Sequence, residues 1–218
     1  ANLNAGAAII TYMRGYNDPR LPVFFEPSKI SPGEYVGIRA GSHIDNYQKM
    51  LEFSHTSKTT FPQTSTAYLL NAAEVYFLRA EGALRGWNMG GQTAKELYEQ
   101  GILLSLQQWG VAGNAGEYIG NETGKPEDFI DPYNDINSSL ALSSITVKWD
   151  DAASNEIKLE KIITQKWISL FPNVTEAWTN FRRTGYPKLF PVVVNNSGGT
   201  ISTEIQIRRL KFLQTEYS

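Results

Sequence analysis

The 218-residue chain contains no cysteine and only two histidines, His43 and His55. The absence of cysteine excludes disulfide bonds, cysteine nucleophiles, iron–sulfur clusters and cysteine-ligated zinc. The two histidines are too few for a histidine-rich metal site. No acidic residue lies at a spacing from either histidine that would indicate a functional pair. We therefore expect both histidines to lie on the surface or in turns, and we expect no metal site that depends on them.

Neither sign of charge predominates, because 20 Lys and Arg residues balance 22 Asp and Glu residues for a net charge of −2. This balance provides no basic surface for nucleic acid, so no nucleic-acid partner is expected. The longest apolar runs, such as residues 7–10 and 191–194, are far shorter than the roughly 20 residues of a membrane-spanning helix. The chain starts at Ala1 without a signal peptide, so we expect a processed or truncated product.

Sequence motifs of the common enzyme classes are also missing. The chain has no Walker loop, no dinucleotide-binding glycine fingerprint, no H-E-x-x-H and no G-x-S-x-G motif. Glu74 and Glu81 lie seven residues apart, and we expect them to pair with Arg79 and Arg85 on a helix surface rather than act as a glycosidase pair. The oxygen-bearing residues of 131–137 do not meet the EF-hand spacing for calcium. We predict no catalytic residue, no metal and no cofactor.

The first two segments of the chain differ in character. Residues 1–63 contain five of the ten prolines and many turn residues, which predicts a loop-rich segment with brief strands at 21–25 and 35–38. Residues 64–110 instead show helical spacing of apolar residues, with Thr64 or Ser65 as the first N-cap and a second helix from about Thr93. Small residues on the facing sides predict close antiparallel packing, so this segment is predicted to be a tetratricopeptide-like helical hairpin.

The remaining segments are predicted to be a long loop followed by helices and strands. Residues 111–154 are polar and rich in glycine, which is typical of a long loop excursion that is functional or mobile. Residues 155–218 are predicted to form two helices and terminal strands. Asn173 is the expected N-cap of the second helix, and Gly185 is its expected end. Strands are expected at 192–194 and 201–207.

Aromatic, amide and arginine side chains recur in the predicted loops, and this composition suits a carbohydrate-binding surface. Sugars present a flat apolar face surrounded by hydroxyl groups, which aromatic rings and planar polar groups can match. An alternative for any single residue is that its ring attaches a loop to the core. The candidate ligand-binding residues are Tyr35, Arg39, Tyr47, Trp87 and Tyr133.

Five segments, in order along the chain, resemble those of the SusD/RagB-like family. The Y-x-D-P-R-L pattern of this family is similar to residues 16–21, and its A-E-x-Y-L-x-R-A-E helix is similar to residues 73–81. The most distinctive part of the family is similar to two stretches of this chain. These are residues 165–171, which read Q-K-W-I-S-L-F, and the stretch from Trp178 to Pro187. A late R-R-L element is matched by residues 208–210.

The resemblance implies a mainly helical fold, with tetratricopeptide-like hairpins packed against an irregular, loop-rich part that has few short strands. It also implies a non-catalytic lipoprotein of Bacteroidetes on the surface of the outer membrane. Such a protein binds glycans or related nutrients and delivers them to a TonB-dependent, SusC-like transporter. The lipidated cysteine and N-terminal helices of the family are absent, so the chain resembles a C-terminal portion. Arg182 and Arg183 are expected to hold the helix end to the final strands.

Two other functions remain open from the sequence. A helical-repeat scaffold would bind a protein or peptide on the concave face of the hairpin rather than at the loops. A glycoside hydrolase would need two carboxylates that the sequence does not pair. Neither the glycan, nor the position of the ligand site within the whole protein, nor the surface that meets a transporter follows from the sequence.

Overall fold

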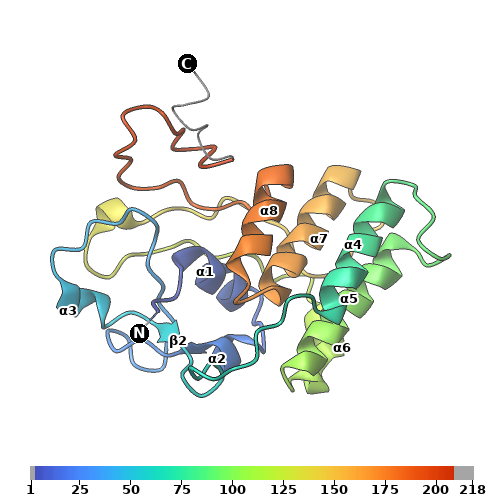
Figure 1. Ribbon diagram of the computed structural model, residues 1–218, viewed down its shortest axis with the longest axis horizontal. Helices are drawn as coiled ribbons and strands as arrows, with labels where there is room; N and C mark the ends of the chain where they lie inside the picture. The colour runs from blue at the N-terminus through green and yellow to red at the C-terminus, as the bar shows by residue number, and fades with distance from the viewer. Residues whose placement is uncertain (1–2, 209–218) are drawn as a thin grey trace.

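The computed structural model of the chain describes residues 3–208 and is mainly helical, as the sequence predicted (Figure 1). Two short strands, β1 and β2, form an antiparallel pair with Phe25 opposite Thr56. Among the described residues, no helix has the length and hydropathy needed to cross a membrane. The elements are α1 (Ala7–Gly15), α2 (Leu21–Phe24), β1 (Phe25–Glu26), α3 (Tyr47–Met50), β2 (His55–Thr56), α4 (Ala72–Leu84), α5 (Ala94–Gln108), η1 (Ala112–Asn114), α6 (Ala115–Ile119), η2 (Asp135–Asn137), α7 (Asn155–Ser169) and α8 (Val174–Thr184).

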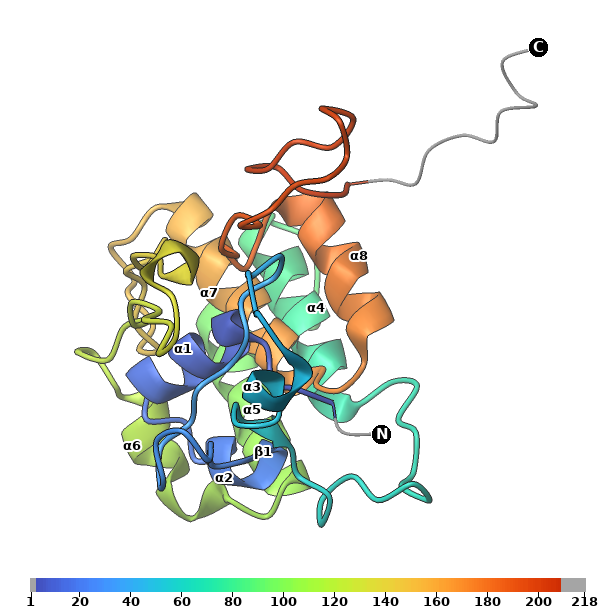
Figure 2. The same ribbon diagram turned by 90° about the vertical axis from the view of Figure 1, so that its left-hand side faces the viewer.

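The long helices occupy one half of the molecule and the irregular segments occupy the other. In Figure 1, α8, α7, α4 and α5 lie side by side on the right, whereas α3 and the loops around it lie on the left. Helix α4 packs against α5 and α7, and α7 also contacts α8. Figure 2 shows α1 and α2 beside this helical layer, where α1 buries Ile9, Ile10 and Met13 in the main core.

Helices α4 and α5 form the predicted hairpin, but α4 begins later than expected. Asn71, not Thr64 or Ser65, is its N-cap, and the Asn71 side chain accepts a hydrogen bond from the backbone N–H of Glu74 (2.7 Å). Residues 64–70, predicted to be helical, are not helical, and Leu69 is exposed. Thr93 caps α5 as predicted and forms a full capping box with Glu96.

The contact between α4 and α5 depends on the absence of a side chain at Gly101. A Cβ atom at this position would lie 2.9 Å from the nearest ring carbon of the buried Phe77. We expect Gly101→Ala to lower the free energy of unfolding by about 1–3 kcal/mol, because neither helix can move apart without loosening the core. Urea unfolding measures this change.

Gly116 of α6 is a matched control for Gly101, because a Cβ atom there meets nothing within 4 Å. We expect Gly116→Ala to be neutral, or to stabilise the chain by up to about 1 kcal/mol, because alanine loses less backbone entropy in a helix. Equal effects of the two substitutions would contradict the close-packing argument.

The first segment is more helical than predicted. Residues 7–15 form α1, and residues 21–24 form α2 instead of a strand; Pro22, whose backbone φ angle is already helical, stands in the first turn of α2. The expected strand at 35–38 is absent, and only an isolated bridge joins Ile38 to Gly6. His55, expected on the surface or in a turn, is half-buried in β2.

The segment 111–154 leaves the helical layer and then returns to the core. It contains the short helix α6, and its later part buries Ile145, Val147 and Trp149. The hydroxyl of Tyr98 on α5 donates a hydrogen bond to the Val147 carbonyl (2.6 Å). This part of the predicted excursion is therefore a structural element of the core.

Helices α7 and α8 agree with the prediction, but the terminal strands do not. Asn173 caps α8 and Gly185, with φ of 83°, ends it. No strand is assigned within 192–207; instead, the N–H groups of Val193 and Val194 donate hydrogen bonds to the backbone carbonyls of residues 40 and 41. These two backbone N–H groups are therefore satisfied by a distant loop. Residues 209 and 210 of the R-R-L element lie outside the described residues, as do 211–218.

The carboxylates of α4 are buried, which corrects the prediction of surface pairs. Glu81 accepts hydrogen bonds from Arg85, as expected, but also forms an ion pair with Arg183 on α8. Glu74 pairs with buried Lys166 on α7 (3.2 Å), whereas Arg79 donates to a backbone carbonyl and an amide in the α4–α5 turn. These carboxylates hold α4 to α7 and α8.

Candidate functional site

Three of the five predicted ligand residues lie in one neighbourhood around α3. We call the surface formed by residues 39–53 and 131–138 the α3 surface; it contains Arg39, Tyr47 and Tyr133. It lies at the left end of the molecule in Figure 1, around α3, and Tyr133 of the second segment is hydrogen-bonded to Glu52 of the first. Two loops that are distant in sequence therefore meet at this surface.

Asn137 and Asp131 join the two loops of the α3 surface. The fully buried Asn137 side chain accepts from the backbone N–H of His43 (3.0 Å) and donates to the His43 carbonyl (3.1 Å). Asp131 accepts from the Asn137 amide (3.0 Å) and from the backbone N–H groups of Tyr133 and Asn134. These bonds fix the loops, so the side chains above them are positioned before any ligand arrives.

Arg39 is committed to the protein itself. Its guanidinium donates to the carbonyls of Asn137 (3.0 Å), Ser138 (2.8 Å) and Pro191 (2.9 Å), and it lies above the Phe190 ring. The group thus connects the α3 surface to the segment after α8. These contacts indicate that Arg39 holds loops in position.

Tyr133 and Tyr47 present the aromatic groups of the α3 surface. The Tyr133 hydroxyl is hydrogen-bonded to Glu52, which raises the Tyr133 pKa to about 12. The Lys49 ammonium lies 4.9 Å from the centre of the Tyr133 ring, and buried Phe53 packs against the ring edge. Tyr47, at the start of α3, is 65% exposed. The open ring of Tyr47 is therefore the group of this surface that is free to stack on a ligand.

Tyr35 and Trp87 do not belong to the α3 surface. Tyr35 is half-buried against the main core, and its backbone carbonyl accepts from Arg14 (3.2 Å). Trp87 is exposed in the turn between α4 and α5, at the opposite end of the long axis from α3 (Figure 1). The five predicted residues therefore do not form one site.

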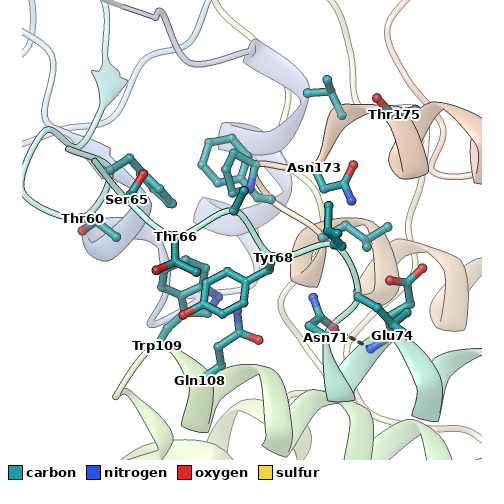
Figure 3. A pocket seen from close by; sticks show the side chains of 18 of the residues that line it. Thr60, Ser65, Thr66, Tyr68, Asn71, Glu74, Gln108, Trp109, Asn173 and Thr175 are labelled. Atoms are coloured by element: carbon teal, nitrogen blue, oxygen red, sulfur yellow. Dashed lines mark hydrogen bonds between the residues drawn. The ribbon is translucent and has the colours of Figure 1, made fainter. Parts of the chain in front are cut away.

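A second candidate is a cavity of about 620 Å³, which we call the α4 pocket. Its walls are residues 59–71, the end of α5 and the turn between α7 and α8. In Figure 3, Gln108 and Trp109 come from the end of α5, whereas Asn71 and Glu74 come from the start of α4. Tyr68 lies between these two groups, on the segment that crosses the pocket.

The floor of the α4 pocket is aromatic and includes one polar atom without a partner. The Phe61 ring contacts both Trp109 and Phe171, with ring centres 5.5 Å apart in each pair. The buried Nε1 of Trp109 has no hydrogen-bond partner among the described residues. The helical spacing of residues 64–110 predicted no pocket here, because Trp109 fits the apolar pattern of a helix; the amide–aromatic pair Gln108-Trp109 at a helix end was the available signal.

The described residues contain no group of three or more histidine, aspartate or glutamate side chains arranged to hold a metal ion. The chemistry that the two surfaces offer is ring stacking, hydrogen bonding and apolar contact. Interactions of this kind hold ligands in binding sites.

Comparison with known proteins assigns the chain to a family. The family model described as Susd and RagB outer membrane lipoprotein matches residues 1–218. A chitin-binding SusD homologue from Flavobacterium johnsoniae is 50% identical to the chain, with a TM-score of 0.91, and the match covers 98% of this chain and 44% of that one. No curated protein matches the chain.

Other solved structures agree with this assignment. A SusD homologue from Bacteroides uniformis is 44% identical with a TM-score of 0.88, covering 98% of this chain and 44% of that one. A SusD-like protein from Bacteroides thetaiotaomicron is 41% identical with a TM-score of 0.88, covering 97% and 44%. The chain thus spans less than half the length of these relatives. It belongs to the SusD-like family of outer-membrane lipoproteins.

Proposed function

We propose that the chain is part of a protein that binds chitin-type glycans at the outer-membrane surface, without catalysis. The observation that carries this proposal is the 50% identity to a homologue described as chitin-binding, over 98% of the chain. Oligomers of N-acetylglucosamine are therefore the first ligands to test. In this proposal an N-terminal segment carries the lipid anchor, and a TonB-dependent, SusC-like transporter receives the glycan.

The α3 surface is the proposed contact for the sugar within this chain. Tyr47 offers an open ring for the apolar face of a sugar, and the linked group of Tyr133, Lys49 and Glu52 supplies polar atoms on the same surface. The loops below are already fixed by Asn137, which lowers the entropy cost of binding. Of the predicted ligand residues, Tyr47 and Tyr133 are proposed to touch the glycan, with Arg39 supporting the loops.

The non-catalytic part of the proposal is supported by the roles of the buried carboxylates. Asp18 pairs with Arg20, Glu74 with Lys166, and Glu81 with Arg183. A glycosidase requires one carboxyl group that donates a proton and a second that acts as a base or nucleophile. Carboxylates engaged with cations inside the helical layer are not available for that chemistry.

We expect Tyr47→Ala to weaken the binding of chitohexaose about fivefold, because loss of one stacked ring costs on the order of 1 kcal/mol. Isothermal titration calorimetry measures the change. Tyr68→Ala is the matched control, since Tyr68 is an exposed tyrosine that lies at the α4 pocket. Unchanged affinity of the Tyr47 variant, combined with weaker binding by the Tyr68 variant, would move the glycan site to the α4 pocket.

Chitohexaose should be compared with maltohexaose, which has the same length but a different linkage and no acetamido groups. The titrations are run on this chain and on the Flavobacterium johnsoniae homologue with its matching 44% replaced by this chain. Preference for chitohexaose supports the proposed ligand. Equal binding of both sugars, or of neither by the longer protein, would contradict it.

The alternative role as a scaffold for protein binding has one observation in its favour, the apolar character of the surface around α4.

A further inference from the structure

A cavity of about 480 Å³ lies beside α3 and has no role in the surfaces described so far. We call it the α1 cavity, because the first turn of α1 forms one of its walls. Its volume lies within the roughly 300–1,000 Å³ of small-molecule sites, so it can admit a substituent of a sugar. The residues that line it are 6–8, 38–42, 44, 50, 189, 190 and 206.

The α1 cavity is continuous with the α3 surface. Residues 39–42, 44 and 50 belong to both. Met50 lies three positions after Tyr47 in α3, and residues at this spacing are neighbours on one side of a helix. A glycan that stacks on the open Tyr47 ring can therefore direct a substituent towards the cavity.

Backbone hydrogen bonds hold the walls of the α1 cavity together. The Ala7 N–H donates to the Ile38 carbonyl (2.8 Å), and the Val194 N–H donates to the Gly41 carbonyl (3.1 Å). Gly41 permits the second contact, because a Cβ atom there would lie 3.0 Å from the backbone nitrogen and oxygen of Val194. The cavity is therefore formed before any ligand arrives, which lowers the entropy cost of binding.

Most of the wall of the α1 cavity is apolar. Apart from Arg39, Ser42 and Gln206, every residue that lines it is glycine or has an apolar side chain. A hydroxyl group placed against such a wall gives up water without gaining hydrogen bonds, whereas a methyl group gains apolar contact. The cavity therefore suits a substituent that ends in a methyl group better than a hydroxyl group.

Two polar groups at the wall can bind a ligand. The Arg39 guanidinium donates to carbonyls through Nε and Nη1, but its Nη2 makes no hydrogen bond to the described part of the chain. The Gln206 Nε2 donates to the Phe190 carbonyl (3.0 Å), which leaves the Gln206 Oε1 as an acceptor. Arg39 can therefore donate to a ligand carbonyl, and Gln206 can accept from a ligand N–H.

We infer that the α1 cavity takes an acetamido group of the chitin-type glycan that stacks on Tyr47; the inference rests on the proposed function. An acetamido group combines a methyl group for the apolar wall, a carbonyl oxygen for the Nη2 of Arg39 and an N–H for the Oε1 of Gln206. Arg39 and Gln206 thus determine specificity for an acetamido group over a hydroxyl group, in addition to the loop contacts that Arg39 makes.

Binding of chitohexaose and of cellohexaose tests this inference. The two sugars share their length and β-1,4 linkage, and differ in carrying an acetamido group or a hydroxyl group at C2. The protein is the Flavobacterium johnsoniae homologue with its matching 44% replaced by this chain. We expect it to bind chitohexaose about fivefold more tightly, because one buried methyl group and its hydrogen bonds are lost with cellohexaose.

Ala40→Leu should remove this preference. Ala40 is exposed and lines the cavity, so a leucine there occupies part of the cavity without disturbing the core. We expect the binding of chitohexaose to weaken about fivefold and that of cellohexaose to stay unchanged, as measured by isothermal titration calorimetry. Ala8→Leu, on the wall formed by α1, should have the same effect.

Ala152→Leu is the matched control, because Ala152 is exposed and lies outside the residues that line the cavity. It should change the affinity for neither sugar. An unfolding midpoint within about 2 °C of that of the parent protein shows that a variant is folded. Should one of the two cavity variants fail this criterion, the other provides the measurement.

The outcomes separate this inference from the proposed function. If chitohexaose binds and Tyr47→Ala weakens its binding, but the cavity variants weaken neither sugar or both equally, the acetamido inference is overturned and the proposed function stands. Equal binding of chitohexaose and cellohexaose by the parent protein would also overturn the inference. Absence of chitohexaose binding by the parent protein would overturn both.

Saturation-transfer NMR with N,N′-diacetylchitobiose provides an independent measurement, because protons that contact the protein receive the most saturation. We expect the acetamido methyl protons to receive more saturation than the ring protons. Ala40→Leu should reduce the methyl signal relative to the ring signals, whereas Ala152→Leu should not. Ring protons that receive as much saturation as the methyl protons, in the parent protein and the Ala40 variant alike, would contradict the inference.

Discussion

Replacing Arg20 by Met is expected to lower the free energy of unfolding by about 3–5 kcal/mol, a large part of the stability of a typical domain. Arg20 is fully buried and forms a two-point ion pair with Asp18, with Nε–Oδ1 at 2.8 Å and Nη2–Oδ2 at 2.5 Å. Met has a similar volume but leaves the buried Asp18 carboxylate without its counter-charge. Urea unfolding measures the loss.

The effect is large because Arg20 also joins three helices. Its guanidinium donates to Ser105 on α5 (2.8 Å), to Tyr118 on α6 (3.1 Å) and to Gln165 on α7 (3.2 Å). Burial disfavours the charged form, but the Asp18 carboxylate outweighs this effect and raises the pKa of Arg20 above its usual value. The charge is thus retained inside the core, and its removal affects every partner at once.

Three comparison variants isolate the ion pair. Arg20→Lys keeps the charge but loses the planar two-point geometry, so an intermediate loss is expected. Arg14→Met removes a partly exposed pair with Glu127 and should cost less than about 1 kcal/mol. Asp18→Leu combined with Arg20→Met removes both charges and should recover part of the stability. A loss for Arg20→Met no larger than that for Arg14→Met would contradict the argument.

This network also shows what the sequence could and could not provide. The Tyr16–Leu21 segment could be recognised as a family pattern, but its physical role could not be derived, because Arg20 meets Gln165 across 145 positions of sequence. Patterns formed by residues close together in the sequence predicted the structure better than patterns that depend on distant contacts. Helical spacing, the Thr93 cap and the glycine at 185 predicted elements that the structure confirms, because each depends on residues a few positions apart.

The predicted site shows the same limit. Composition identified aromatic and arginine side chains in loops, but it could not show which of them the protein uses for itself. Arg39 is occupied by carbonyls about 100 and 150 residues away, and Tyr133 is bonded to Glu52. Tyr47 stays open because its short helix projects from the surface, a property that no sequence spacing encodes. The α4 pocket likewise depends on three distant segments meeting.

Lys166→Met is the second substitution with a large expected effect, about 3–5 kcal/mol at neutral pH. Lys166 is 1% exposed, and its ammonium contacts Glu74 of α4 (3.2 Å) as well as Glu176 (3.1 Å) and Asn180 (3.2 Å) of α8. The single cation therefore links three helices. Its loss leaves the buried Glu74 without a counter-charge, beside the second carboxylate, Glu176, which keeps its hydrogen bond from the Asn180 amide.

The loss of stability in Lys166→Met should depend on pH. The direction of this dependence follows from the pKa values of the two carboxylates, Glu74 and Glu176. Burial raises the pKa of Glu74 in the folded chain, although Lys166 opposes the rise, so the stability from this group is complete at low pH and declines as pH rises through the folded-state pKa. Burial also opposes ionisation of Glu176, but Lys166 outweighs it and lowers the Glu176 pKa, which favours the fold at higher pH. Without Lys166 both pKa values rise, so the destabilisation is largest near pH 7 and shrinks towards about pH 4.5.

Urea unfolding of Lys166→Met and the parent chain at several pH values tests this expectation. Lys95→Met is the matched control, because Lys95 forms an exposed pair with Asp151, and its small effect should not change with pH. Adding Glu74→Gln to Lys166→Met should restore part of the stability near pH 7 and flatten the pH dependence. A loss of the same size at pH 7 and at about pH 4.5 would mean that Lys166 stabilises the three helices by packing its chain, and that the buried charge of Glu74 and the half-buried charge of Glu176 do not require it.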